Sequence, residues 1–317
     1  MPFVRAQTGG LLALLALSCD APGAATRAEQ GTGAITPDAE VTAEGDGSIG
    51  GSAAAPRVAC AAPQRLAWLP DVLPEPSGLA PATQRRQLWA HNDSEQPARL
   101  YRLDVAGRVL QRVRVSAAMQ DWEDVAAGRC ARGTCLYLAD IGDNLHARPV
   151  VRVLRVREPA AREASIAEYE AFPFRYPEGP ADAEAIFVLP GERLFVITKG
   201  RNRPVTLYRY PGKLRADTVT LEPVRLLGDG IAQFPDMVTG ASATRSGRHV
   251  AVRTYAYVDL YHVRNGSLVA DARIDLSALA EAQGEGVALL DGGELYLVGE
   301  RGNREPGPLG RVRCVLP

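Results

Sequence analysis

The stretch Asp121-Trp-Glu-Asp-Val125, followed after a turn by Leu136-Tyr-Leu-Ala-Asp-Ile-Gly-Asp-Asn144, decides the fold because four other parts of the chain repeat its pattern. Each copy joins a short segment with a central polar or small residue to an apolar strand that ends in a polar loop. The other copies begin at residues 75–79, 182–186, 238–242 and 283–287, and continue at residues 88–93, 194–202, 250–257 and 295–303. A unit of short strands that returns every several dozen residues is typical of a repeat architecture.

The spacing of the copies predicts an all-β fold, a β-propeller of five four-stranded blades. Equivalent positions are held by Ser77, Glu123, Glu184, Thr239 and Glu285, at spacings of 46, 61, 55 and 46 residues. A blade usually takes about 40–50 residues, so two spacings match a blade and two leave room for longer loops. The alternative is six blades, with a degenerate unit hidden within residues 218–234.

The strands of each blade follow from the alternation of apolar and polar residues. Residues 109–115 alternate in this way, as a half-buried strand should. The other strands that follow the repeated segments are expected at residues 99–104, 150–157, 168–176, 205–210, 218–227, 258–263, 268–274 and 311–316. The last unit lacks an outer strand, and residues 65–69 are expected to supply it and close the ring, which removes exposed sheet edges.

The cysteines support this closure. Cys60 precedes the N-terminal strand and Cys314 lies in the last strand, so ring closure would bring them together. Cys130 and Cys135 flank a short turn within the second unit. We therefore expect the disulfides Cys60–Cys314 and Cys130–Cys135, which require an oxidising compartment. The alternative is buried free thiols in a cytosolic protein.

The N-terminus independently predicts export. Residues 1–19 have one positive charge followed by a short apolar stretch, which indicates a signal peptide. This segment ends in Ala16-Leu-Ser-Cys19, similar to a bacterial lipobox, so we expect a lipid anchor at Cys19, with ordinary secretion as the alternative. Residues 20–57 form a tether without aromatic residues, and residues 58–317 form the propeller domain. We expect an extracytoplasmic monomer that contacts the membrane only through the anchor.

The charge distribution argues against nucleic-acid binding. The formal net charge is −1, the basic residues are almost all arginine, and no stripe of basic residues appears along the chain. No nucleic-acid-binding motif is present either, so DNA and RNA are not expected as partners.

Polar residues concentrate in the loops that lead into the first strand and out of the second strand of each unit. In a propeller these two loop types emerge on one face, so the residues are expected to surround one channel mouth that binds a small molecule or a protein. Trp122 is a candidate for stacking on the ligand, and Lys199, Arg253 and Arg301 are candidates for binding an anion. The full set of ligand-binding candidates is Asn92, Asp93, Trp122, Lys199, Arg253, Glu285 and Arg301. The alternative is that the arginines pair with neighbouring carboxylates.

Carboxylates crowded around a channel repel one another, and a bound cation would relieve this repulsion. Oxygen ligands from Asp, Glu and Asn suit calcium, so we predict a calcium site made of Glu123, Asp143, Asn144 and Glu184. The alternative is that the Asp and Asn residues cap turns, and that the repeated Glu position bonds the backbone of the neighbouring unit. Catalytic candidates are Glu123, Glu184 and His146. No nucleophile elbow, zinc-protease motif or phosphate loop occurs in the sequence.

The repeated segments Glu75-Pro-Ser-Gly-Leu79, Asp121-Trp-Glu-Asp-Val125, Asp182-Ala-Glu-Ala-Ile186 and Gln283-Gly-Glu-Gly-Val287 resemble the inner strands of secreted bacterial propellers of the phytase-like, SdiA-regulated and gluconolactonase-like groups. The resemblance covers essentially the whole predicted domain. It implies calcium-dependent hydrolysis of phosphoesters or lactones, or ligand binding without a reaction. The gluconolactonase-like pattern has its nearest metal-ligand matches at Glu75 or Glu123, Asp143 and Asn144. Those relatives commonly have six blades, whereas five units are counted here.

Two classes of function follow from these observations. The first is a lipid-anchored or secreted propeller that binds calcium and a ligand or protein at an acidic mouth. The second is a metal-dependent hydrolase of phosphoesters or lactones. A five-bladed glycosidase with Glu123, Glu184 and Glu285 as channel carboxylates is disfavoured, because Ser77 stands where those families have an Asp.

Overall fold

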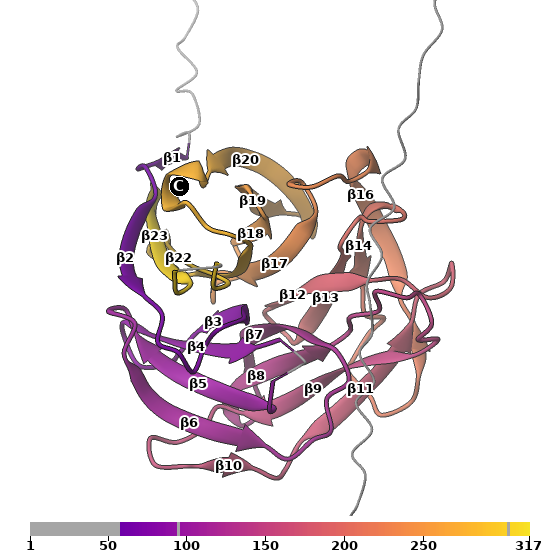
Figure 1. Cartoon of the computed structure of the whole chain (residues 1–317). Coiled ribbons are helices and arrows are strands. Elements are labelled where there is room, and N and C mark those ends of the chain that lie inside the picture. The colour runs from indigo at the N-terminus through magenta and orange to yellow at the C-terminus, as the bar shows by residue number, and fades with distance from the viewer. Residues whose placement is uncertain (1–57, 94–95, 303–304) are drawn as a thin grey trace, which may run out of the picture. The chain divides into compact units, whose positions relative to one another are not determined.

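The computed structural model describes residues 58–93, 96–302 and 305–317, which form five small β-sheets arranged around a common axis (Figure 1). This confirms the all-β propeller with five blades. The described residues contain one 3-10 turn, Ser277–Leu279, and no helix among them is long and apolar enough to cross a membrane. The predicted signal peptide, the tether and Cys19 lie outside the described residues.

Each blade is an antiparallel meander whose first strand is innermost. Blade 1 contains β3 (Pro76–Pro81), β4 (Gln87–Asn92), β5 (Arg99–Asp104) and β6 (Val109–Val115). Blade 2 contains β7 (Trp122–Cys130), β8 (Gly133–Asp140), β9 (Val151–Arg157) and β11 (Glu170–Arg175). Blade 3 contains β12 (Ala183–Leu189), β13 (Arg193–Thr198), β14 (Pro204–Arg209) and β16 (Glu222–Ile231). Blade 4 contains β17 (Val238–Ala243), β18 (His249–Thr254), β19 (Tyr257–Arg264) and β20 (Ser267–Asp275).

Blade 5 is completed from both ends of the described chain. It contains β21 (Gly284–Leu289), β22 (Glu294–Gly299) and β23 (Pro308–Val315), and its outer edge is formed by β1 (Ala59–Cys60) and β2 (Gln64–Trp68). Cys60 and Cys314 face each other in the β1–β23 ladder and form a disulfide. The predicted ring closure and both predicted disulfides, Cys60–Cys314 and Cys130–Cys135, are therefore confirmed.

The apolar core lies between neighbouring blades. One cluster, for example, packs Phe187 of blade 3 against Val252 of blade 4, and four similar clusters join the other neighbouring pairs around the ring. Because both faces of the inner strands are covered, β12 and β21 have no exposed residue. Removing apolar surface from water in this way is the main stabilising contribution to a closed ring.

The two long repeat spacings have a structural explanation. The chain between β9 and β11 leaves blade 2 and adds the short strand β10 (Ser165–Ile166) parallel to β6 of blade 1. The second long spacing, between Glu184 and Thr239, contains β15 (Val219–Thr220), which leaves blade 3 and runs parallel to β11 of blade 2. Residues 218–234 therefore hold β15 and the fourth strand of blade 3, and the alternative of a sixth blade is wrong because the whole segment is used in this way.

Candidate functional site

The innermost strands bring the five equivalent repeat positions to the channel, where all five side chains are buried. Two of them bond neighbouring blades through hydroxyl groups. Ser77 Oγ donates to the backbone carbonyl of Glu123, and Thr239 Oγ1 donates to the carbonyl of Gly284 at 2.9 Å. The other three positions are Glu123, Glu184 and Glu285. At the other three equivalent positions the channel therefore presents buried carboxyl groups.

Three carboxyl groups converge at the mouth beside blades 1 and 2. Asp93 follows β4, Asp121 precedes β7, and Glu123 lies on β7; one carboxylate oxygen of each lies within 4.8 Å of the others. Asp93 and Asp121 are half-buried and Glu123 is buried. We call this group the carboxylate triad.

Gly142 makes room for the triad. An added Cβ at this position would overlap Oε1 of Glu123 and Oδ2 of Asp121. The loop after β8 therefore approaches the two carboxylates more closely than any side chain would allow. Glycine is the residue that permits such an approach of backbone to a site.

Crowding and burial together disfavour ionisation in the channel. Burial raises the pKa of Glu123 well above its usual value, and repulsion from Glu184, Asp93 and Asp121 raises it further. Burial also raises the pKa of Glu285, with contributions from Glu184 and Glu300. A cation held among these groups would remove the repulsion and favour the charged forms.

Lys199 is a fixed positive charge next to this group. Its ammonium forms a buried ion pair with Glu184. Burial by itself would lower the pKa of Lys199, but Glu184 and Tyr255 outweigh it, so the pKa is raised and the side chain stays charged. Burial raises the pKa of Glu184 to about 7, although Lys199 opposes this shift.

The predicted calcium ligands have different surroundings in the structure. Glu123, Asp143 and Glu184 do not form a group with converging oxygens among the described residues. Asp143 instead caps a turn, since its carboxylate accepts the backbone N–H groups of Ala147 at 2.8 Å and Arg148 at 3.0 Å. Asn144 Oδ1 accepts from Arg201 at 2.6 Å. Asp143 therefore caps a turn and Asn144 bonds a neighbouring loop, which agrees with the alternative interpretation that these side chains stabilise loops.

Asp121 is the residue of the triad that the predicted sites omitted. Asp121 lies in the loop that enters blade 2, and Asp93 lies in the loop that leaves the second strand of blade 1. Because β3 and β7 are neighbouring inner strands, these two loops meet across the boundary between the blades. The repeat alignment places both loop types on one face, which is a signal that Asp121 could belong to the site. The alignment does not say which two loops come close enough for their carboxylates to share a cation.

Trp122 was predicted to stack on a ligand, and the structure contradicts this. Its side chain is 1% exposed and belongs to the core between blades 1 and 2. The indole stacks on His91 with ring centroids 4.0 Å apart, and its N–H donates to the carbonyl of Asp124 at 2.9 Å. The ring packs inward because the apolar space between two blades buries more of its surface than the wet mouth would.

The two arginines predicted to bind an anion have protein partners. Arg253 is fully buried, forms an ion pair with Glu281 and donates to the carbonyl groups of Gly286 and Val298. Arg301 forms an ion pair with Asp71. The anion-binding role is therefore corrected to the alternative interpretation, in which the arginines pair with carboxylates.

The remaining candidates lie around the mouth in different roles. Asn92 is held by the backbone, because Oδ1 accepts from Glu75 N–H at 3.3 Å and Nδ2 donates to the carbonyl of Val72 at 2.9 Å. His146 contacts the Asn202 side chain through Nε2 at 2.5 Å. Glu285 faces the channel near Glu184 and Glu300. The catalytic roles of Glu123, Glu184 and His146 stay predictions.

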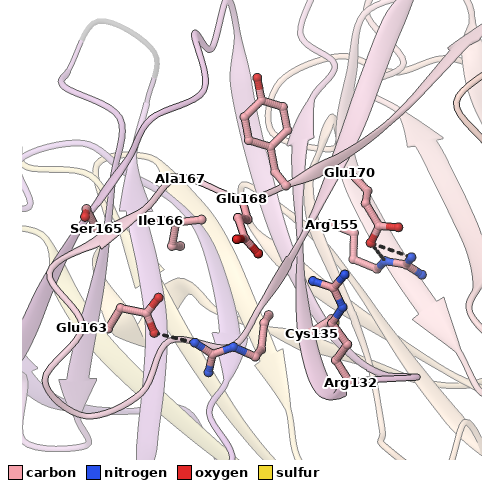
Figure 2. A pocket seen from close by; sticks show the side chains of 11 residues that line it. Arg132, Cys135, Arg155, Glu163, Ser165, Ile166, Ala167, Glu168 and Glu170 are labelled. Atoms are coloured by element: carbon pink, nitrogen blue, oxygen red, sulfur yellow. Dashed lines mark hydrogen bonds and ion pairs between the residues drawn. The ribbon is translucent and has the colours of Figure 1, made fainter.

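One cavity lies away from the mouth. It has a volume of about 410 Å³ and lies at the outer part of blade 2, beside β10. Figure 2 shows that its charged side chains are largely paired with one another. Arg155 bonds Glu170, and Arg157 bonds Glu163 at 2.8 Å. Two of the three arginines that line this cavity are therefore paired with carboxylates, and the third is Arg132.

Comparison with known proteins supports the fold. No protein-family model matches the chain, and no curated protein matches it. The PQQ-bound aldose sugar dehydrogenase of Streptomyces coelicolor is 12% identical, with 82% of this chain and 99% of that chain covered and a TM-score of 0.51. The apo-form of the soluble aldose sugar dehydrogenase of Escherichia coli is 12% identical, with 80% and 99% covered and a TM-score of 0.47. A putative 6-phosphogluconolactonase of Bacteroides uniformis is 16% identical, with 76% and 69% covered and a TM-score of 0.38.

The likeness to the Streptomyces coelicolor enzyme, at 12% identity, concerns the propeller fold alone. What the present chain does therefore has to be argued from its own channel mouth.

Proposed function

We propose that this protein is an extracytoplasmic β-propeller that binds calcium at the carboxylate triad and an oxygen-rich ligand next to it. The observation that supports this most directly is the convergence of Asp93, Asp121 and Glu123 within 4.8 Å. Calcium takes six to eight oxygen ligands in flexible geometry. Three carboxylates supply only part of this shell, which leaves positions for water or for oxygen atoms of a ligand.

The location outside the cytoplasm is part of the proposal. Two disulfides fit an oxidising compartment. Lipidation of Cys19 stays a prediction that mass spectrometry of the protein from membranes would test. A thioether-linked diacylglyceryl group on Cys19 is the expected result, and a soluble secreted form cleaved elsewhere would contradict it.

Calcium binding is tested by titrating chelator-treated protein with calcium and following its thermal unfolding. We expect calcium to raise the melting temperature of the original protein, because a ligand that binds only the folded state stabilises it. Glu123→Gln and Asp121→Asn should each remove most of this rise. The matched control is Glu294→Gln, which removes one carboxylate at the opposite end of β22 from the mouth. An equal rise in Glu123→Gln would exclude the triad as the calcium site.

A second candidate function is metal-dependent hydrolysis of phosphoesters or lactones. It is favoured by Glu184, whose pKa of about 7 suits a group that exchanges protons at neutral pH next to the triad. Purified protein should then hydrolyse members of a phosphoester or lactone panel, and both a chelator and Glu184→Gln should abolish turnover. Calcium-dependent stabilisation without turnover on either panel would favour the binding protein.

A further inference from the structure

The outer strand of blade 3 is unusual among the outer strands of blades 1 to 4. In β6, β11 and β20 at least two residues are buried, whereas β16 has none. Three apolar side chains on β16 or just after it are more than half exposed: Leu226 at 55%, Ile231 at 52% and Phe234 at 64%. A long outer strand with exposed apolar residues is the kind of edge to which another strand adds.

Blades 1 and 2 show how this fold covers such an edge. In blade 1 the added strand β10 runs parallel to β6, and the backbone N–H groups of Arg114 and Ser116 donate to the carbonyl groups of Ala164 and Ile166, both at 2.9 Å. In blade 2 the added strand β15 runs parallel to β11 in the same way. In the described part of the chain β16 ends the sheet of blade 3 and has no added strand, as Figure 1 shows at the outer side of β14.

Two hollows lie on opposite faces of β16. The first has a volume of about 330 Å³ and is lined by the apolar residues Pro204, Pro223, Val224 and Leu226 together with Glu178, Arg203, Thr206, Tyr208 and Arg225. The second has a volume of about 320 Å³ and opens toward blade 4. Pro204 of β14 lines the first hollow and its neighbour Val205 lines the second, which fits the alternation of side chains along a strand.

The two hollows differ in charge. The second is lined by the ion pair of Asp259 with Arg273 and by Asp229 and Asp236, which form no ion pair among the described residues, so its carboxylates outnumber its arginine. The first hollow has Arg203, Arg225 and Glu178 beside its apolar side chains, so it carries no excess of negative charge. Successive side chains of an added strand point to opposite faces. One set would therefore meet the first hollow, beside Leu226, and the other set would meet the second hollow, beside Asp229 and Asp236.

We propose that the free edge of β16 docks an extended segment of a partner protein in which aliphatic and basic side chains alternate. The segment adds a parallel fifth strand to blade 3, as β10 and β15 do in blades 1 and 2. Backbone hydrogen bonds to β16 supply affinity. The aliphatic side chains occupy the hollow beside Leu226, and the basic side chains pair with Asp229 and Asp236.

The probe for this docking is an octapeptide of alternating valine and lysine with blocked ends, added to the full chain. Hydrogen exchange followed by mass spectrometry should show slower exchange in residues 222–231 when the peptide is bound. A peptide of alternating valine and glutamate should not bind, because Asp229 and Asp236 would repel it.

Variants locate the binding. Leu226→Lys should weaken binding about tenfold or more, because it places a positive charge in the aliphatic hollow. The matched control is Val269→Lys on β20, which ends the sheet of blade 4 and has a comparable exposed side chain. If Leu226→Lys did not fold, the double variant Asp229→Asn with Asp236→Asn, both at exposed positions, should weaken binding by a similar factor.

The proposal is overturned by three results. The first is no binding of the valine–lysine peptide at about 1 mM, which is the limit of weak specific association. The second is binding that protects the mouth instead of residues 222–231 and that Glu123→Gln removes. The third is a dimer of this chain in light scattering that Leu226→Lys dissociates, since a second copy would then occupy the edge.

Discussion

The carboxylate of Asp124, on β7 of blade 2, accepts a hydrogen bond from the backbone N–H of Ile186, on β12 of blade 3, at 2.9 Å. The same oxygen accepts from the N–H of Ala241 in blade 4 at 3.3 Å, and the other oxygen accepts from Val125 at 2.8 Å. The side chain is fully buried. One carboxyl group therefore joins the inner strands of three blades, next to a residue of the carboxylate triad.

Replacing Asp124 should destabilise the ring. Asp124→Asn puts an N–H₂ group where an oxygen now accepts backbone N–H groups, so at least one buried donor loses its partner. We expect a loss of about 3 kcal/mol in the free energy of unfolding, measured in urea. The control is Asp229→Asn, an exposed carboxylate on β16, which should change stability by less than about 0.5 kcal/mol. Equal stability of the two variants would show that the bonds of Asp124 do not hold the blades together.

The disulfide that closes the ring should contribute more than the one within blade 2. Cys60–Cys314 spans 254 residues of sequence, whereas Cys130–Cys135 spans 5. A longer closed loop removes more entropy from the unfolded chain, so Cys60→Ser with Cys314→Ser should cost about 3 kcal/mol more than Cys130→Ser with Cys135→Ser. Urea unfolding of the two double variants measures the difference. Similar losses would mean that the pairing of β1 with β23 closes the ring without help from the covalent link.

A methyl group at Gly142 should impair the carboxylate triad without removing any carboxylate. Gly142→Ala would overlap the side chains of Glu123 and Asp121 and force them apart. We expect the affinity for calcium, measured by calorimetry, to fall about tenfold or more. Gly228→Ala is the matched control, because an added Cβ there meets no atom within 4 Å. Unchanged affinity in Gly142→Ala would argue against calcium at these two carboxylates.

The calcium-free protein should lose stability as the pH rises. Burial raises the pKa of Glu184 from 4.5 to about 7 and also raises the pKa values of Glu123 and Glu285. Between about pH 4.5 and 7 these three carboxyl groups bind more protons in the folded state than in the unfolded state, and their contribution makes the free energy of unfolding decrease with increasing pH. The lowered pKa values of His91 and His249 act in the opposite direction. Thermal unfolding in a chelator at several pH values measures this slope.

Calcium should flatten the same slope, since a bound cation favours the ionised carboxylates. Glu184→Gln in the chelator should flatten it as well, because the variant removes one of the groups that takes up a proton on folding. A slope in the chelator that is the same in Glu184→Gln as in the original protein would contradict the raised pKa of Glu184.

The site could be predicted only in part, and particular residues show why. Glu123 was expected at the mouth from its repeat position, and it lies in the triad. Asp143 lies in an equally polar loop, but its carboxylate accepts hydrogen bonds from backbone N–H groups of the turn that it caps. Trp122 follows Asp121 directly, yet it points into the space between two blades. A repeat pattern specifies which loops share a face, whereas the direction of each side chain depends on packing that the pattern does not contain.

The sequence by itself determined the propeller, the repeated units with most of their strands, and the closure of the ring through Cys60 and Cys314, whereas the choice of five blades over six came from the structure. These features depend on period, alternation and chain order, all of which are local properties of the sequence. Only the tertiary structure decided that Asp93 and Asp121 meet Glu123, that Asp124 joins three blades, and that no other described strand pairs with the outer edge of β16. The physical reason is that these relationships are set by how neighbouring blades pack against each other, and this packing brings together groups that no spacing along the chain relates.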